Sequence, residues 1–150
     1  MTGENPFTHV DPELLPVLAE LRLREPIFHT PAFGLSADEF LRSTAPGYWE
    51  VGASGRRYSR ELILTWARER PEHFVDGSKV GWRTEDFGLL QLGPETYLLT
   101  YTLDQNGRHT RRSTIWRQDN DGWRILFHQG TIVAGEEIDA LPGNEDKIFC

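Results

Sequence analysis

The sequence predicts an α+β domain in which three N-terminal helices pack on one face of a curved antiparallel sheet. Helix start signals followed by apolar residues at helical spacing lie in the first half of the chain. From Lys79 onward the hydrophobic period changes to two, which is typical of strands. Three turn signals divide this second half into four strands: Gly93-Pro94, Asn106-Gly107 and Asp121-Gly122.

Composition favours one soluble globular domain. A chain of 150 residues buries roughly 70% of its unfolded surface, so it can form a sizeable core. The formal net charge of −7 argues against nucleic acid or acidic membranes as partners. The single cysteine, Cys150, excludes an internal disulfide and a Cys-rich metal site. Because no secretory signal and no run of about 20 apolar residues is visible, we expect a cytoplasmic protein without membrane contact.

Three helices are expected from their start signals. Asp11-Pro12-Glu13 supplies an N-cap and a first-turn proline, although Pro16 can serve as the first-turn residue of a helix over 16–25 instead. Ser36-Ala37-Asp38-Glu39 is a capping box, which predicts a short second helix. Ser59 caps a third helix that stops before Pro71.

The antiparallel strands form a meander. The Asn106-Gly107 turn requires positive φ at both residues and places Tyr101 opposite Arg112. The domain core is expected to span about 12–133, with a tail over 134–150. We expect strands at about 79–92, 96–104, 108–118 and 123–133, preceded by a short strand at 48–51.

The last hairpin separates its residues into two faces because successive strand side chains alternate. On the inner face we expect Arg112, Trp116, Phe127, Gln129 and Thr131. On the outer face we expect Ser113, Ile115, Leu126 and His128. A slip of one residue would invert this arrangement.

Arg112 is the residue around which a site is expected. A guanidinium on a concave apolar face must find an acid or bind an anion, since a buried unpaired charge is costly. A ligand with a carboxylate or phosphate would satisfy it. An internal ion pair with Glu50 or Asp86 is the competing interpretation, and we consider it the more frequent arrangement.

Glu50 and Asp86 are the candidate general bases. An adjacent arginine lowers a carboxyl pKa, so Glu50 cannot easily be both the partner of Arg112 and a base near neutral pH. Asp86 reaches the same cavity if its strand follows the parity of Leu90 and Leu92, whereas Phe87 and Leu89 fit the opposite parity. Tyr101 and Gln129 would then orient a substrate or stabilise an oxyanion.

Aromatic and histidine side chains complete the predicted site. Trp49, Trp116 and Phe127 can line a pocket for a flat ligand, and His29 reaches the cavity if the first helix continues past Pro26. The five histidines lack metal-ligand spacing, so we expect no metal and no cofactor.

Three motifs support a family resemblance: Tyr48-Trp49-Glu50-Val51-Gly52-Ala53-Ser54-Gly55, Arg112-Ser113-Thr114-Ile115-Trp116-Arg117, and the segment from Trp123 to Thr131. Together, over about 14–133, they resemble an uncharacterised bacterial branch of the nuclear-transport-factor-2-like superfamily, which includes ketosteroid-isomerase-like proteins. The resemblance implies a cone-shaped half-barrel with a central pocket and a homodimer through the outer sheet face, where Ser113, Ile115, Leu126 and His128 are expected.

The resemblance does not define an activity, because the same fold carries isomerases, cyclases, dehydratases, hydrolases and non-catalytic modules. We expect a small-molecule pocket protein, with cofactor-free acid/base catalysis on an organic substrate as one form. Asp86 or Glu50 would be the base, with Arg112 as the anion-binding group. A ligand-binding or dimeric association module without catalysis is the alternative.

Overall fold

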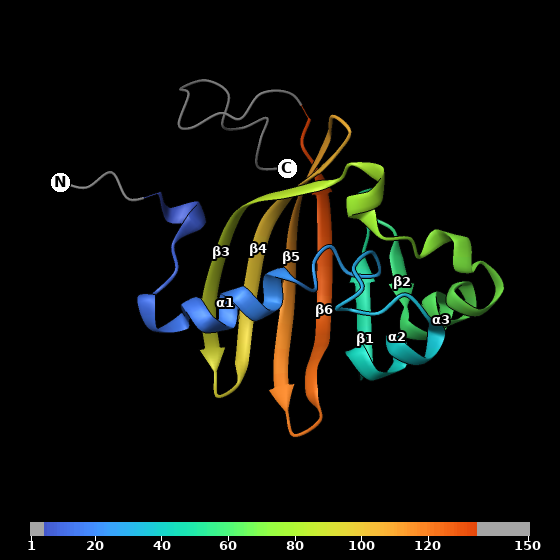
Figure 1. Ribbon diagram of the computed structural model, residues 1–150, viewed down its shortest axis with the longest axis horizontal. Helices are drawn as coiled ribbons and strands as arrows, with labels where there is room; N and C mark the ends of the chain where they lie inside the picture. The colour runs from blue at the N-terminus through green and yellow to red at the C-terminus, as the bar shows by residue number, and fades with distance from the viewer. Residues whose placement is uncertain (1–4, 135–150) are drawn as a thin grey trace.

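A computed structural model describes residues 5–134, and within this range three α-helices pack against one curled, mixed sheet of six strands (Figure 1). The predicted α+β class is confirmed. The strand order is β2-β1-β6-β5-β4-β3, and β1 runs parallel to β6 while every other neighbouring pair in this range is antiparallel. The strands are β1 (Thr44–Val51), β2 (Arg57–Ser59), β3 (Arg83–Gly93), β4 (Thr96–Gln105), β5 (Arg108–Asp119) and β6 (Gly122–Ile132).

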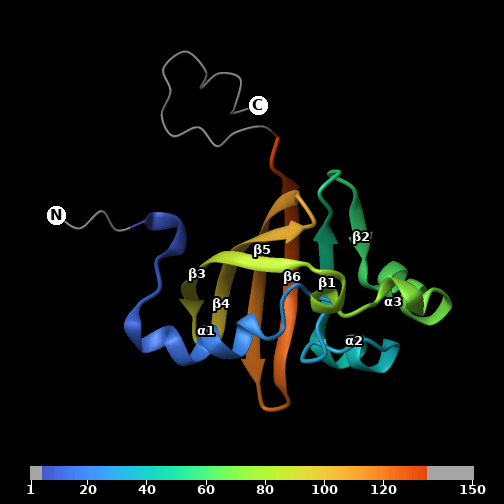
Figure 2. The same cartoon turned by 45° about the horizontal axis from the view of Figure 1, so that its top comes forward.

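The helices lie on one side of this sheet. In Figures 1 and 2, α1 (Leu15–Arg22) crosses in front of β3 to β5, while α2 (Ala37–Ser43) and α3 (Arg60–Glu69) lie beside β1 and β2. We call the sheet face under α1 the inner face and the opposite one the outer face. The helix-bearing side buries the core, and no helix of residues 5–134 covers the outer face of the central strands.

Local signals explain where the helices begin. Pro16 lies in the first turn of α1, after a 3₁₀ turn at Pro12–Leu14, so the later of the two predicted starts is close to the observed one. In the capping box of α2, the Glu39 amide donates to Ser36 Oγ at 3.2 Å, and Ser36 Oγ donates to Glu39 Oε1 at 2.9 Å. The Leu62 amide donates to Ser59 Oγ at 3.1 Å at the start of α3.

The hairpin register between β4 and β5 agrees with the prediction, since Tyr101 lies opposite Arg112. Asn106 and Gly107 have φ values of 56° and 99°, as the predicted turn requires. The next hairpin has a two-residue loop, because Asp119 pairs with Gly122.

A β-bulge in β6 overturns the predicted faces beyond it. Ile115 pairs with Phe127 while Trp116 pairs with Ile125, so Leu126 is an extra residue without a pairing partner. Before the bulge, Trp123 and Ile125 are buried on the inner face. After it the alternation is inverted: His128, expected outside, is buried, whereas Phe127, Gln129 and Thr131, expected inside, are on the outer face.

The edge near β1 also differs from the prediction. β1 begins at Thr44 and includes Pro46 and Gly47, where its pairing with β6 is irregular between Thr44 and Trp49. β2 was not predicted, because its three residues carry no apolar alternation. Residues 135–150 of the predicted tail lie outside the described residues.

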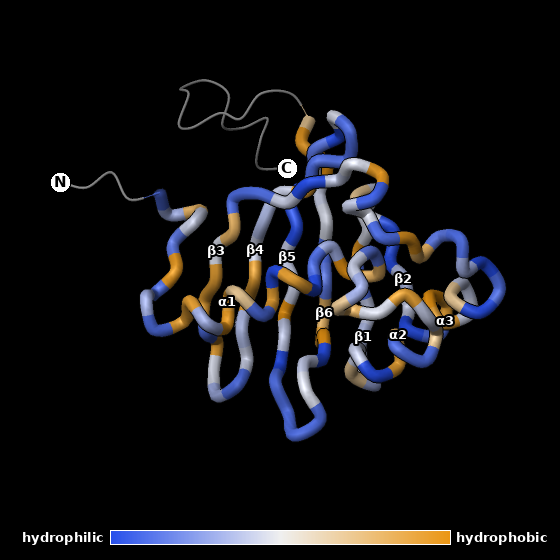
Figure 3. Tube along the Cα trace, in the orientation of Figure 1, coloured by the Kyte–Doolittle hydropathy of each residue, from blue (hydrophilic) through white to orange (hydrophobic). Residues whose placement is uncertain are grey.

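The core is rich in aromatic rings. Phe28, in a left-handed conformation with φ 69°, places its ring 5.2 Å from Phe33, 5.5 Å from Phe40 and 5.5 Å from Phe74. Figure 3 shows hydrophobic residues along α1 and the middle of β3 and β4, and hydrophilic residues at the β5–β6 turn. Between residues 5 and 134, no helix is long and apolar enough to cross a membrane.

Candidate functional site

Polar side chains form a row across the inner face. Glu50 on β1 is paired with His128 on β6, and His128 is paired with Thr114 on β5. In the next row of the sheet, Arg112 on β5 is paired with Tyr101 on β4. The sheet therefore brings together residues that are separated by up to 78 positions in the chain, as from Glu50 to His128.

Glu25 anchors this cluster from the segment after α1. It is 3% exposed, and its two carboxylate oxygens accept from the Tyr101 hydroxyl at 2.6 Å and from Trp116 Nε1 at 3.0 Å. Burial raises the pKa of Glu25, and the Tyr101, Thr114 and Trp116 donors and the Arg112 charge partly oppose that shift. Sequence reasoning missed Glu25, since a lone glutamate before Pro26 gives no periodic signal that it is buried.

Glu50 faces inward together with Tyr48. Burial raises the pKa of Glu50 to about 7, while the Tyr48 hydroxyl and the Arg112 charge lower it. Burial also raises the pKa of Tyr48 well above its ordinary value, so this phenol stays protonated. The Tyr48 hydroxyl is buried and forms no hydrogen bond of good geometry within residues 5–134.

Arg112 lies in the middle of these groups. Its Nε donates to Thr110 Oγ1 at 2.9 Å, and its guanidinium lies over Gly130, where an added Cβ would be 3.7 Å from Nε. Among residues 5–134, no carboxylate is within 4.0 Å of the guanidinium nitrogens, so the ion pair expected with Glu50 or Asp86 is not formed. Its charge lowers the pKa values of Glu25, Glu50 and His128.

His128 is an inner residue, contrary to the prediction of an outer, dimer-forming one. Its Nδ1 lies 2.7 Å from Thr114 Oγ1. Its Nε2 is buried and has no hydrogen-bond partner among residues 5–134. Burial and the nearby Arg112 charge lower the pKa of His128 to about 3, so the ring is neutral. The bulge at Leu126 is the reason that this histidine points inward.

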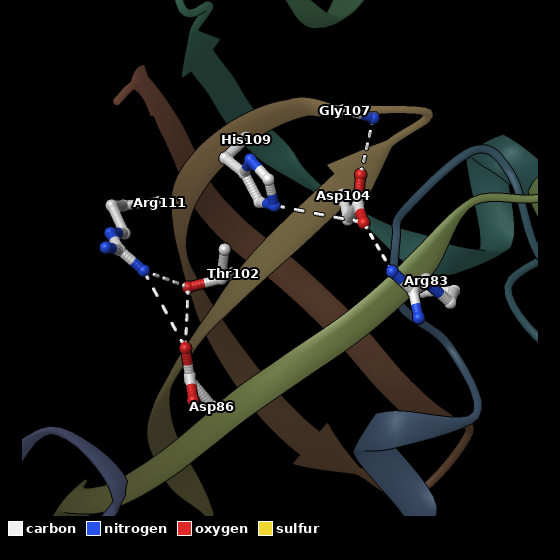
Figure 4. Close-up of polar contacts among 7 residues, drawn as sticks. All are labelled: Arg83, Asp86, Thr102, Asp104, Gly107, His109 and Arg111. Carbon is white, nitrogen blue, oxygen red and sulfur yellow. Dashed lines mark hydrogen bonds and ion pairs between the residues drawn. The ribbon is translucent and has the colours of Figure 1, made fainter. Parts of the chain in front are cut away.

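Asp86 does not reach the inner face. It has a φ of 59°, lies at an irregularity of β3 between Glu85 and Gly88, and approaches Arg111 at 3.7 Å and the Thr102 hydroxyl at 3.4 Å (Figure 4). Phe87 and Leu89 are the core-facing residues of this strand. Asp86 and Glu50 are therefore on opposite faces and cannot act on one substrate atom.

Figure 4 shows a second polar group nearer the β4–β5 turn. Asp104 accepts from Arg83 at 2.7 Å and from the Gly107 amide at 2.8 Å, and His109 lies 3.8 Å away. The Gly107 amide and Arg83 hold the pKa of Asp104 below its ordinary value. These contacts fasten the hairpin to β3.

A groove of about 800 Å³ runs over the outer face. Three predicted site residues line this groove: Asp86, Gln129 and Thr131. Tyr101 and Arg112 also border the groove, but their side chains hydrogen-bond to the inner residues Glu25 and Thr110. Trp49 and Phe127 also lie on the outer face, where their ring centroids are 4.8 Å apart.

His29 lies at the rim of the inner cluster. Its Nδ1 is 3.0 Å from the Val75 carbonyl oxygen, and its ring meets that of Trp82 at 4.8 Å. Burial lowers the pKa of His29. Of the predicted site residues, the inner face thus holds Glu50, Arg112, Tyr101 and Trp116, with His29 at the rim against Val75 and Trp82. The others lie on the outer face: Asp86, Gln129, Thr131, Trp49 and Phe127. In the described range no three His, Cys, Asp or Glu side chains are arranged to hold a metal ion.

No protein-family model matches the chain, and no curated protein matches it either. The fold is nevertheless similar to those of several solved structures. A cystatin-like fold protein from Burkholderia xenovorans LB400 has a TM-score of 0.61 and 16% identity over 84% of this chain and 96% of that one. A protein of unknown function from the DUF3225 family of Pectobacterium atrosepticum SCRI1043 has a TM-score of 0.60 and 17% identity over 88% and 100%.

An NTF2-like protein from Cytophaga hutchinsonii ATCC 33406 has a TM-score of 0.57 and 9% identity, over 83% of this chain and 100% of that one. At these identities the similarity is one of fold. The chain has the nuclear-transport-factor-2-like, cystatin-like α+β fold, as expected from the resemblance.

Proposed function

We propose that the inner face binds a small organic molecule with a carboxylate or phosphate group, and that Glu50 exchanges a proton with it. The observation that supports this proposal is the Arg112 guanidinium, which is partly buried on the inner face beside Thr110 and Gly130 and has no ion pair in the described range. A buried cation without an acid is costly, and an anionic ligand would compensate it.

The neighbouring groups fit cofactor-free acid/base chemistry. Glu50, with a pKa of about 7, is present both as acid and as base at neutral pH, which suits general acid/base catalysis. The protonated Tyr48 hydroxyl has a hydrogen to donate to a developing oxyanion. Tyr101, for which this role was predicted, already donates to Glu25. Isomerisation, cyclisation, dehydration and hydrolysis are reactions of this type.

Ligand binding is tested by thermal denaturation with a series of small carboxylates, of which propionate is the simplest. The melting temperature should rise with propionate concentration in the wild type and in Arg117→Gln, which removes a half-buried arginine of the same strand. The rise should be lost in Arg112→Gln. An equal rise in both variants would show that Arg112 does not bind the anion.

Proton exchange is tested by carbon-13 NMR of the Glu50 carboxyl, which should titrate near pH 7. Titration near the ordinary value of 4.5 would remove Glu50 as a base. Native mass spectrometry of protein purified from its producing cells would identify the occupant, and turnover of that compound should be lost in Glu50→Gln.

A non-catalytic association module is the second candidate, favoured by a different observation. The outer face carries exposed apolar side chains, with Leu90 54% and Trp49 43% exposed, next to the groove of about 800 Å³. A second copy of the chain covering this face would bury them. Under this hypothesis the inner polar row only stabilises the fold, and Glu50→Gln would leave association unchanged.

A further inference from the structure

The groove on the outer face has the size of a small-molecule site, and the proposed function of the inner face does not use it. Its volume of about 800 Å³ lies within the range of about 300–1,000 Å³ that is usual for such sites. Its lining changes in character along β4. The apolar side chains of Leu90 and Leu98 lie opposite each other at one end, and the polar side chains of Asp86, Thr102 and Arg111 lie at the other. Sites for organic molecules typically combine an apolar wall with a few polar groups that fix the orientation of the ligand.

A bulge in β3 directs the Asp86 carboxylate into this groove. β3 takes three steps from Glu85 to Gly88 where the paired β4 takes two, so β3 has one extra residue. Asp86 lies within this bulge and has a φ of 59°, a conformation that few residues other than glycine adopt. Its Oδ2 lies 3.4 Å from the Thr102 hydroxyl. In a regular strand Asp86 would face the opposite side from Glu85, so the bulge is what brings its charge to the outer face.

Asp86 and Arg111 present opposite charges side by side on the two sides of the Thr102 hydroxyl (Figure 4). Arg111 Nη1 donates to Thr102 Oγ1 and lies 3.7 Å from Asp86 Oδ2. A direct charge-assisted hydrogen bond would be about 2.7–2.9 Å long, so the two charges are close without being joined by one. The Asp86 side chain is 54% exposed and that of Arg111 is 42% exposed. Because a guanidinium has five N–H groups and a carboxylate accepts several hydrogen bonds, both can bind further partners.

Between the charged end and the leucines the groove has a low floor. At the level of Thr100 the paired residue of β3 is Gly88, which has no side chain. A Cβ added to Gly88 would lie 3.0 Å from Thr100 Oγ1 and 2.7 Å from the Phe7 carbonyl oxygen. The absence of this atom keeps the path along β4 open beside the N-terminal segment. Leu98 and Thr102 are four positions apart, about 13 Å along the strand, which is the length of a small organic molecule with a side chain.

We propose that this groove binds a small zwitterion with a large apolar side chain, such as an aromatic amino acid. Asp86 accepts from its ammonium group, Arg111 donates to its carboxylate, and its apolar part lies over Thr100 toward Leu90 and Leu98. The ammonium and the carboxylate of an α-amino acid are attached to one carbon atom, so they fit two opposite charges 3.7 Å apart.

The charges of the site favour a zwitterion over a ligand with a single charge. A simple anion would be repelled by Asp86 and by the formal net charge of −7 of the chain, and a simple cation would be repelled by Arg111. Trp49 lies on the same face but does not line the groove, so a small ligand there leaves it available for self-association.

Calorimetric titration with three related compounds tests the ligand class. The probes are phenylalanine, 3-phenylpropanoate, which lacks the ammonium group, and 2-phenylethylamine, which lacks the carboxylate. Phenylalanine should bind at least about tenfold more tightly than either, because each charged group contributes about that factor through its hydrogen bonds. Equal affinities for the three compounds would overturn the zwitterion. If phenylalanine does not bind at millimolar concentration, the proposal fails and a second copy of the chain becomes the favoured occupant of the groove.

Four variants of the full chain test the position of the site. Asp86→Asn and Arg111→Gln should each weaken phenylalanine binding about tenfold or more, and Asp86→Asn should abolish the preference for phenylalanine over 3-phenylpropanoate. Glu85→Gln and Arg117→Gln are the matched controls, since these residues lie on the same two strands but do not line the groove. Both should bind phenylalanine like the wild type. Unchanged binding in Asp86→Asn and Arg111→Gln would overturn the site. The propionate experiment on Arg112 concerns the inner face alone, so its failure would leave this result unaffected.

Discussion

Glu50 and His128 lie side by side on the inner face, and burial shifts their pKa values in opposite directions. The pKa of Glu50 is raised from 4.5 to about 7, and that of His128 is lowered from 6.5 to about 3. For Glu50 the folded state binds the proton more tightly, so the free energy of unfolding falls as pH rises from 4.5 to 7. For His128 the unfolded state binds it more tightly, so the free energy of unfolding falls as pH drops from 6.5 to 3. The two effects oppose each other where these ranges overlap.

Replacing Glu50 by Gln separates these effects. Each pKa unit corresponds to about 1.4 kcal/mol, so the ionised Glu50 destabilises the fold by up to about 3 kcal/mol above pH 7. We expect Glu50→Gln to unfold at higher urea concentration than the wild type at pH 8 and at a similar concentration at pH 4.5. The exposed Glu13→Gln is the control, in which the difference from the wild type should not change with pH. A difference for Glu50→Gln that is constant across this range would contradict the raised pKa.

Two glutamates in the described part of the chain accept from tryptophan indoles, which allows a matched comparison. Glu25→Ala leaves the Trp116 indole and the Tyr101 hydroxyl buried without an acceptor, and should lower the free energy of unfolding by about 2–5 kcal/mol. Glu20, which accepts from Trp123 Nε1 at 3.1 Å, is itself exposed. Glu20→Ala should therefore cost much less in the same urea experiment. Similar losses in both variants would show that burial of Glu25 is not what makes it important.

At the scale of elements, the predictable parts were those with local signals. Turn residues located the hairpins of β3 to β6, and caps located α2 and α3, because a turn or a cap is specified by a few adjacent residues. The bulge at Leu126 has no such signal: one extra residue in β6 is stabilised by packing on both sides of the strand. Everything after it, including the faces of Phe127, His128 and Gln129, was therefore inverted. The same holds for Glu25, whose burial depends on partners 76 and 91 positions away.

The N-terminal segment is held against the edge of β3 by close backbone contact. The Leu89 amide donates to the His9 carbonyl at 3.2 Å, and a Cβ on Gly88 would lie 2.7 Å from the Phe7 carbonyl oxygen. Gly88→Ala should push the segment away, so that the Leu89 amide exchanges hydrogen faster in deuterium oxide. Gly93→Ala, in the same strand and with open space around its Cβ, is the control. Unchanged exchange in Gly88→Ala would show that the segment adapts without detaching.

At the scale of the whole molecule, self-association through the outer face remains a prediction. Of the residues proposed for it, Ser113 and Ile115 are on that face and half-buried, Leu126 is the bulged residue, and His128 is buried inside. Leu90 is the better probe, since it is exposed and lines the outer groove.

Sedimentation at micromolar concentration should show a dimer for the wild type and a monomer for Leu90→Lys. Leu23→Lys changes a leucine that is 66% exposed just after α1, outside the sheet, and should remain dimeric. A wild type that sediments as a monomer would refute the association hypothesis while leaving the inner site untouched.

The bulge of β6 has a consequence for comparing this chain with its relatives. A relative with the same residues in this strand but a regular pairing without the bulge would turn its histidine to the outer face, because Ile125 and His128 are three positions apart. A relative that lacks the one extra residue would keep the histidine inside, because Phe127 would then follow Ile125 directly. The residues of the motif alone therefore do not show which face the histidine occupies.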